Sequence, residues 1–187
     1  VTEEHPTEPL SLYGIHKLLG EKYYAYYAHN FGIHGVSVRI PNPYGPRQQV
    51  KHAKYSIVGW FMRLAMEKET IQIFGDGSQE RDYIFIDDIV AALLYTIVNG
   101  QAGEAYNIGS PERMTFGDMV DAIITTVGAG DKEYLPWPED YEKNETGDYV
   151  ADTSKIELDT NWRPRVKFAD GIAEMVAYYK ENKELYW

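Results

Sequence analysis

Residues 36–49 read V-S-V-R-I-P-N-P-Y-G-P-R-Q-Q, and they join a short β-branched run to a loop rich in proline. The run at 36–40 predicts a buried strand, and the proline and glycine residues within 42–49 predict a rigid loop. Upstream, Ser11 is placed to cap a helix that stops near Gly32. The stretch therefore marks the point where a helix, a strand and a loop follow one another.

The alternation of helices and strands continues along the rest of the chain. Asp87 is expected to cap the helix at 87–98, and Thr115 with Asp118 resembles a capping box. Residues 128–150 are predicted to be irregular. The other predicted strands lie at 71–74, 82–86 and 104–108, and the other predicted helices at 11–30, 55–67, 115–127, 153–159 and 169–182. This alternation predicts an α/β fold.

The composition argues against several classes of function. The chain has 187 residues, a net charge of −11 and no cysteine. A nucleic-acid partner would need a basic face, and a membrane span would need an apolar run of about 18 residues, so neither is expected. The absence of cysteine excludes disulfides and thiolate chemistry and favours a cytoplasmic location. The five histidines show no metal-ligand spacing, so no metal site is expected.

Tyr13 and Lys17 stand four residues apart in S-L-Y-G-I-H-K, residues 11–17. On a helix this spacing places both side chains on one face, one turn apart. With 16 tyrosines in the chain such a pair can arise by chance, and a second one, Tyr179 with Lys183, is interpreted as a solvated helix end. Two interpretations of the first pair stay open at this point: an acid–base pair for catalysis, or neighbours on an exposed helix face.

The motifs around Tyr13 follow a recognisable order. After Y-G-I-H-K come R-I-P-N-P-Y-G-P-R-Q-Q, I-F-G-D-G-S-Q-E-R-D-Y-I-F-I-D-D, A-Y-N-I-G-S, D-T-S-K and N-W-R-P. This series resembles the extended short-chain dehydrogenase/reductase family, the NAD-dependent sugar-nucleotide epimerases and dehydratases. N-P-Y-G-P-R-Q-Q-V-K-H, with P-W-P-E-D later, is most similar to the branch described as UDP-glucose 4-epimerase-like.

The resemblance implies an incomplete doubly wound, Rossmann-like parallel sheet with a smaller α/β substrate-binding lobe. Residues 1–42 and 80–110 would be the C-terminal part of the NAD-binding domain, and residues 43–79 and 111–187 the substrate-binding lobe. Family members begin with a glycine-rich turn for the NAD pyrophosphate and carry a catalytic Ser or Thr upstream of the tyrosine. Neither motif occurs here, so we expect a C-terminal portion of such an enzyme, with weak or no NAD binding of its own.

The resemblance also assigns roles to residues beside the cofactor. Tyr13 would take a proton from a sugar hydroxyl as hydride leaves for NAD, and Lys17 would favour the phenolate and hold the nicotinamide ribose. Ile40 and Pro41 occupy family positions on the nicotinamide side. The expected reaction is NAD-dependent epimerisation of a nucleotide-diphosphate sugar at C4 through a 4-keto sugar. A 4,6-dehydratase or decarboxylase of the same family is the alternative, and an inert sugar-nucleotide-binding fragment is the alternative of another class.

Four residues are expected to bind the sugar nucleotide. Arg81 matches the family arginine that pairs with the diphosphate, and its alternative role is an ion pair with Asp82 or Asp76. Gln72 and Phe74 match positions beside the nucleotide base, where ordinary strand alternation explains them equally. Asn42 matches a sugar contact, and it is also explained as a turn residue before a proline.

Two further features complete the expectation. Many relatives carry a second arginine about ten residues before D-x-S-K, but Glu142 stands near that position here, with Lys143 as the possible replacement. Tyr23, Tyr24, Tyr26 and Tyr27 crowd the predicted helix that carries Tyr13. Such a number of rings on one helix predicts a packed face, and family members often form homodimers through this helix.

Overall fold

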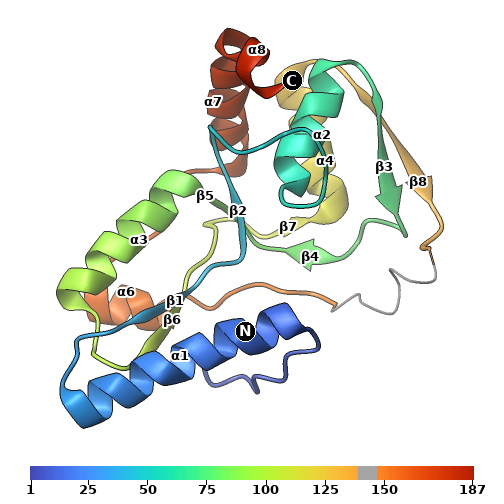
Figure 1. The fold of residues 1–187 in the computed structure, drawn as a ribbon. Helices are drawn as coiled ribbons and strands as arrows, with labels where there is room; N and C mark the ends of the chain where they lie inside the picture. Colours follow the sequence, from blue (N-terminus) through green and yellow to red (C-terminus); the bar gives the residue numbers. More distant parts are fainter. Residues whose placement is uncertain (139–146) are drawn as a thin grey trace.

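Two groups of helices and strands lie next to each other in the computed structural model, which describes residues 1–138 and 147–187 (Figure 1). The first group, the α1 layer, contains α1 (Leu12–Phe31), β1 (Ser37–Arg39), α3 (Ile86–Asn99), β6 (Ala105–Asn107) and α6 (Ser154–Thr160). The second group, the α7 lobe, contains α2 (Ile57–Met66), β3 (Thr70–Phe74), β4 (Glu80–Arg81), β7 (Met114–Thr115), α4 (Phe116–Val127), β8 (Asp131–Leu135), α7 (Phe168–Glu181) and α8 (Lys183–Tyr186). Between the two groups run β2 (Asn42–Tyr44) and β5 (Tyr83–Phe85).

Most strand pairing is parallel. In the described residues β1 pairs with β6, β2 with β5 and β3 with β8, all in parallel, and β4 pairs with β7 in antiparallel fashion. Parallel strands need long crossover connections, and helices supply several of these here. The α/β fold class predicted from the sequence is therefore confirmed.

Helices α1 and α3 cover opposite faces of the β1–β6 pair (Figure 1). Val38 of β1 packs into the cluster that includes Ala92 of α3 and Tyr106 of β6. The next residue, Arg39, forms an ion pair with Glu21 of α1. Because successive side chains of a strand point to opposite faces, the two helices must lie on opposite sides of the pair.

The predicted helix caps are observed. The Ser11 hydroxyl accepts a hydrogen bond from the backbone N–H of Gly14 at 3.1 Å, which starts α1. Gly32, with a φ of 67°, ends the same helix in the left-handed conformation that glycine adopts without strain. Thr115 and Asp118 form a reciprocal capping box at the start of α4, as predicted.

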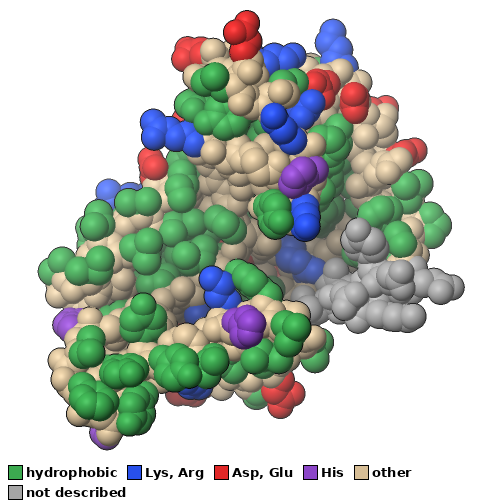
Figure 2. Space-filling model, in the orientation of Figure 1, with side chains coloured by type: hydrophobic (Ala, Val, Ile, Leu, Met, Phe, Trp, Pro, Cys, Tyr) green, Lys and Arg blue, Asp and Glu red, His purple; other side chains and the backbone are tan. Residues whose placement is uncertain are grey.

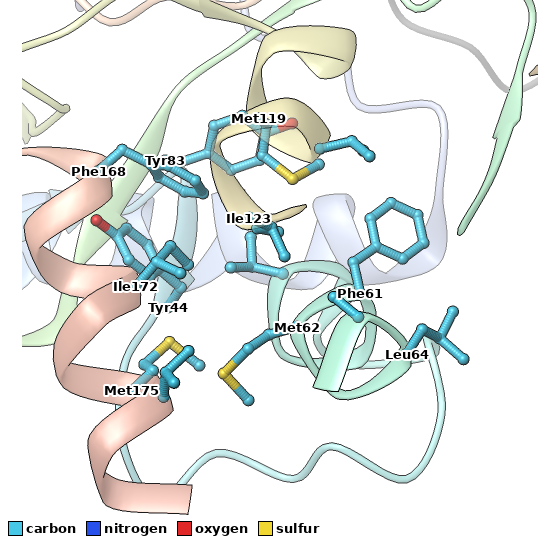
Figure 3. Close-up of a cluster of buried hydrophobic side chains, with 14 of the residues drawn as sticks. Tyr44, Phe61, Met62, Leu64, Tyr83, Met119, Ile123, Phe168, Ile172 and Met175 are labelled. Atoms are coloured by element: carbon cyan, nitrogen blue, oxygen red, sulfur yellow. The ribbon is translucent and has the colours of Figure 1, made fainter. Parts of the chain in front are cut away.

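The larger core belongs to the α7 lobe. Figure 3 shows side chains from α2, α4 and α7 meeting those of β2 and β5. The labelled members are Tyr44, Phe61, Met62, Leu64, Tyr83, Met119, Ile123, Phe168, Ile172 and Met175, all of them buried. A smaller cluster lies in the α1 layer and consists of Ile84, Ile89, Ala92, Tyr106, Ile108, Ile156 and Trp162. Helix α1 contributes no buried residue to either cluster.

The division into an NAD-binding part and a substrate-binding lobe stays a prediction. Ile156 of α6 and Trp162, both from the predicted substrate-binding range 111–187, pack into the smaller cluster of the α1 layer. The indole N–H of Trp162 donates to the carbonyl of Asp88 at 3.2 Å.

Two stretches predicted to be loops contain strands. Residues 42–44, at the start of the predicted rigid loop, form β2, because Asn42 pairs with Tyr83 of β5 in register. Residues 131–135, within the stretch predicted to be irregular, form β8 along β3. The sequence of β8, D-K-E-Y-L, is mostly polar, so it does not predict a strand. The segment becomes a strand because it pairs with β3, which is distant in the sequence. Residues 139–146 of the same stretch lie outside the described residues.

The prediction that Asp87 caps α3 is wrong. The N-cap residue is Phe85, which makes no side-chain cap bond, and both Asp87 and Asp88 lie in the first helical turn. Asp88 is buried and its carboxylate accepts hydrogen bonds from the backbone N–H groups of Arg165 and Val166, at 3.0 and 2.9 Å. The carboxylate thus fixes the segment before α7.

The second Tyr-x-x-x-Lys pair is not a solvated helix end. Tyr179 is fully buried in the α7 lobe, and its hydroxyl donates to the carbonyl of Gln48 at 2.5 Å. Lys183 lies in α8, with its ammonium 5.3 Å from the ring centroid of Trp187.

None of the helices in the described part of the chain combines the length and the apolar character needed to cross a membrane.

Candidate active site

Tyr13 and Lys17 lie on one exposed face of α1, as their spacing predicts. The Lys17 ammonium is 5.3 Å from the centroid of the Tyr13 ring, and 73% of Tyr13 is exposed. Both side chains line a hollow of about 1260 Å³, here called the α1 cleft. Its lining includes Tyr13, His16, Lys17, Val38, Ile40 and Pro41. The structure therefore brings together the four residues for which the sequence predicts a cofactor role.

An ion pair fixes α1 against the strand that leads into the α1 cleft. The guanidinium of Arg39 donates to both carboxylate oxygens of Glu21, at 2.8 and 2.9 Å, and to the carbonyl of Glu3 at 3.1 Å. The hydrogen bond from Arg39 lowers the pKa of Glu21 below its usual value. Because Arg39 is the last residue of β1, this pair attaches α1 to the end of the strand, directly before Ile40 of the cleft lining.

A second cavity, the β3 pocket, lies in the α7 lobe and has a volume of about 590 Å³. Its lining includes Trp60, Gln72, Phe74, Arg81, Phe116 and Trp137. Ile71 and Ile73 of β3 are fully buried, so the alternate residues Gln72 and Phe74 face the other side, toward the pocket. Three of the four residues predicted to bind substrate therefore share one cavity.

The polar groups of the β3 pocket have defined partners. The Gln72 amide N–H₂ donates to the carboxylate of Glu133, directly opposite on β8, at 2.9 Å. Because a carboxylate can only accept, the Gln72 carbonyl must point away from Glu133. Arg81 donates through Nη1 to the carbonyls of Glu80 and Gly147, at 2.9 and 2.6 Å.

The two aspartates proposed as alternative partners of Arg81 have other bonds. Asp82 is buried and accepts from the backbone N–H groups of Ser110 and Ala151, at 2.5 and 3.1 Å. Burial raises the pKa of Asp82 above its usual value, and these two bonds oppose the change. Asp76 accepts from the N–H and hydroxyl of Ser78, at 2.9 and 2.6 Å.

Asn42 bonds a segment next to the α1 cleft to a segment next to the β3 pocket. Its backbone N–H and its side-chain amide both donate to the carbonyl of Asp82, at 3.1 and 2.9 Å. Asn42 follows Pro41 of the α1 cleft, and Asp82 follows Arg81 of the β3 pocket. The bonds of Asn42 are structural, and they join the residue after Pro41 to the residue after Arg81. Figure 2 shows the surface hollowed between α1 and the part of the molecule above it, with Lys and Arg side chains on its walls.

Sequence analysis missed the aromatic walls of the β3 pocket. Trp60, Phe116 and Trp137 come from α2, α4 and the segment after β8, so no local spacing links them. Trp137 lies so close to Gly75 that a Cβ there would overlap the indole, and Gly75 also has a φ of 75°. Glycine at position 75 thus permits both the backbone conformation of the G-D-G turn and the close approach of the Trp137 ring. Glu142 and Lys143, which stand at the place of the second family arginine, lie outside the described residues.

The fold and the order of the motifs indicate a family. A helix with Tyr-x-x-x-Lys beside a parallel strand pair agrees with the resemblance to the short-chain dehydrogenase/reductases. The family described as NAD dependent epimerase/dehydratase matches residues 1–109. The chain belongs to this family.

Relatives of known name cover almost the whole chain. UDP-glucose 4-epimerase of Mycolicibacterium smegmatis is 29% identical over 190 residues, which cover 98% of this chain and 57% of that protein. The structure of UDP-glucose 4-epimerase from Thermotoga maritima with UDP-glucose has a TM-score of 0.88 and 29% identity, over 98% of this chain and 58% of that one. The structure of dTDP-glucose 4,6-dehydratase from Bacillus anthracis in complex with NAD has a TM-score of 0.85 and 27% identity, over 100% and 57%. The chain thus spans little more than half the length of these relatives.

Proposed function

We propose that the chain is the part of an NAD-dependent enzyme that binds a nucleotide-diphosphate sugar and epimerises it at C4. The observation that carries the proposal is the presence of two cavities with different linings, whose neighbouring residues Asn42 and Asp82 are hydrogen-bonded. Tyr13 and Lys17 line the α1 cleft, and Gln72, Phe74 and Arg81 line the β3 pocket. A ligand with its sugar near Tyr13 and its nucleotide in the β3 pocket would extend past Asn42, which lies between them.

The residues of the α1 cleft fit one end of NAD. Lys17 would donate to the nicotinamide ribose, and the apolar surfaces of Ile40 and Pro41 would lie against the nicotinamide ring. NAD, when bound, supplies the acceptor and later the donor of a hydride. The sequence has no glycine-rich turn for the pyrophosphate, so we expect NAD binding by this chain alone to be weak or undetectable.

The chain's own residues supply the acid–base and binding chemistry. Tyr13 would take the proton of the 4-hydroxyl of the sugar and later return it, and the ammonium of Lys17 stabilises the phenolate charge that forms. Arg81 would bind the diphosphate, because a guanidinium presents paired donors to phosphate oxygens. The rings of the β3 pocket offer stacking surfaces to the base, and the carbonyl of Gln72 offers it an acceptor.

A second reaction is favoured by one finding. The Bacillus anthracis relative of equal coverage is a dTDP-glucose 4,6-dehydratase, and its overall fold agrees nearly as well as that of the epimerase. Both reactions begin with proton removal by the same tyrosine, so the described residues serve either one. The nature of the product separates the two.

Product analysis of the full-length protein tests the proposal. The protein is incubated with NAD and either UDP-glucose or dTDP-glucose, and the sugar nucleotides are separated and identified by nuclear magnetic resonance. We expect the 4-epimer of the substrate. A stable 4-keto-6-deoxy sugar as the product would replace the epimerase proposal with the dehydratase. Unchanged substrates, under conditions where the protein binds UDP, would mean that the protein binds the sugar nucleotide without converting it.

We also propose that the exposed face of α1 pairs with a second copy of the chain. Tyr26, Tyr27 and Phe31 form a ring cluster with centroids 5.4–6.1 Å apart, and all three are exposed. Figure 2 shows hydrophobic side chains along α1 and along α3. Analytical ultracentrifugation of Tyr27→Glu should show a shift toward monomer, and Leu158→Glu, at an exposed position of α6, should show none.

The lack of cysteine agrees with a cytoplasmic location, which stays a prediction.

A further inference from the structure

A guanidinium lies against two indole rings, one of which lines the β3 pocket. The Arg63 guanidinium carbon is 5.8 Å from the ring centroid of Trp60 and 5.3 Å from that of Trp187. Trp60 lines the pocket, whereas Trp187 lies beyond α8, more than a hundred residues later in the sequence. Arg63 is held in turn by Glu67, one helical turn away, at 3.2 Å. The stack therefore joins a pocket wall to a distant segment.

The far end of this stack is firmly packed. The ring of Trp187 lies 6.0 Å from that of Tyr179, which is fully buried, and its backbone N–H donates to the carbonyl of Lys183 at 3.0 Å. The hydroxyl of Tyr179 donates to the carbonyl of Gln48 at 2.5 Å. Gln48 belongs to the segment between β2 and α2 that contributes Ala53 to the pocket lining. The cluster of Trp187 and Tyr179 is thus joined to the α2 wall through Arg63 and to the segment that carries Ala53 through Gln48.

The physical effect of such support is to restrict the rotation of Trp60. A cation against an indole face is attracted by the ring quadrupole, and this attraction grows when the cation is partly desolvated, as Arg63 is at a side-chain exposure of 20%. A wall held in its binding orientation before the ligand arrives lowers the entropy cost of binding. Affinity then depends on residues that do not touch the ligand.

We propose that Arg63 and Trp187 are positioning residues, which hold Trp60 as a preformed stacking wall for the nucleotide. This inference rests on the proposed function of the β3 pocket. According to this proposal, residues 183–187 influence nucleotide affinity although their side chains lie outside the pocket lining.

Calorimetric titration of the full-length protein with UDP tests the inference, at a temperature well below the Tm of every variant. We expect Trp60→Ala to weaken UDP binding about tenfold, which is ~1.4 kcal/mol, and Arg63→Met and Trp187→Ala to weaken it about three- to tenfold. The conservative variants Arg63→Lys and Trp187→Phe should recover part of the loss. Lys132→Met is the matched control, because Lys132 makes the same type of contact with Tyr134 at 5.4 Å, away from the pocket lining, and should stay within twofold.

A double-mutant cycle separates positioning from general destabilisation. If Arg63 acts through Trp60, then Arg63→Met should have no further effect on UDP affinity in the Trp60→Ala background. In turnover assays the single variants should raise KM and leave kcat unchanged. Additive losses in the double variant, or full affinity in Arg63→Met, would overturn the inference. A parent protein that binds neither UDP nor dTDP would overturn the proposed function, and this inference with it.

Discussion

The α1 layer and the α7 lobe differ in how they use their helices. Helix α1 has 20 residues and buries none of them, whereas α7 has 14 residues and buries six. In the described residues β1 has one strand partner, β6, and α3 exposes apolar side chains beside it. The exposed apolar residues of α3 include Val90, Leu93, Leu94, Ile97 and Val98. The helix with the candidate catalytic pair therefore contributes no buried residue to the core of the described residues.

The two Tyr-x-x-x-Lys pairs express the same difference on a smaller scale. Tyr13 is 73% exposed and faces the α1 cleft beside Lys17, whereas Tyr179 is fully buried and bonds to a backbone carbonyl. Equal spacing thus leads to an exposed tyrosine in a cleft in one place and to a buried, packed tyrosine in the other. The surroundings decide the role of the motif.

The largest expected effect separates chemistry from stability. Tyr13→Phe in the full-length enzyme should lower kcat by about 10²- to 10⁴-fold, because it removes the acid–base group. Its unfolding free energy should change by less than about 0.5 kcal/mol, since the side chain is exposed. Tyr179→Phe should lower stability by about 1 kcal/mol through loss of the bond to Gln48.

Steady-state kinetics and urea unfolding check the pair of variants. Tyr95→Phe, an exposed tyrosine of α3, is the control and should change neither quantity. Retained turnover in Tyr13→Phe would break the comparison and leave the pair as an ordinary exposed helix face.

Core substitutions should expose the same contrast in stability. Ile172→Ala, at a fully buried site of α7, should cost about 2–5 kcal/mol because it leaves a cavity. Leu94→Ala, at a position of α3 that is 59% exposed, should cost less than about 0.5 kcal/mol in this chain. The midpoints of urea unfolding measure both, provided that the slope of the transition is unchanged. A large cost at Leu94 would contradict the exposure of this face of α3 and break the comparison.

Within the α7 lobe, the open face of β3 should matter for binding rather than for stability. Glu133→Ala removes the partner that orients the Gln72 amide, so its carbonyl is no longer held away from Glu133. We expect UDP affinity to fall about three- to tenfold, the size of one hydrogen bond of ~1 kcal/mol. Asp131→Asn, on the same face of β8 and two residues away, is the control for titration calorimetry. Equal affinity in Glu133→Ala would remove Gln72 from the base-binding residues.

The smallest expected effect concerns the ion pair that fixes α1. The pKa of Glu21 is lowered in the folded chain by the bond from Arg39, so the pair stabilises the fold at neutral pH. This contribution should disappear as the pH falls through the lowered pKa, below the ordinary Glu value of about 4.3. Glu21→Gln should cost about 0.5 kcal/mol at pH 7, typical of a partly exposed pair, and progressively less as the pH falls below the ordinary Glu value. Urea unfolding over a series of acidic pH values checks this, and a cost that does not change with pH would assign it to packing.

The sequence by itself determined the α/β class, the caps of α1 and α4, and the face shared by Tyr13 and Lys17. These features depend on contacts within a few residues, such as the bond from Gly14 to Ser11 and the helical spacing of four. The order of motifs also identified the family, which the comparison confirms.

Tertiary structure alone decided which residues share a cavity. β8 is polar and becomes a strand only through its pairing with β3, and the walls Trp60, Phe116 and Trp137 come from three separate elements. The burial of Tyr179 and the use of Asp88 to hold the segment before α7 likewise depend on contacts with residues more than seventy positions away. Such contacts leave no local period in the sequence, because their partners are set by the packing of the whole chain.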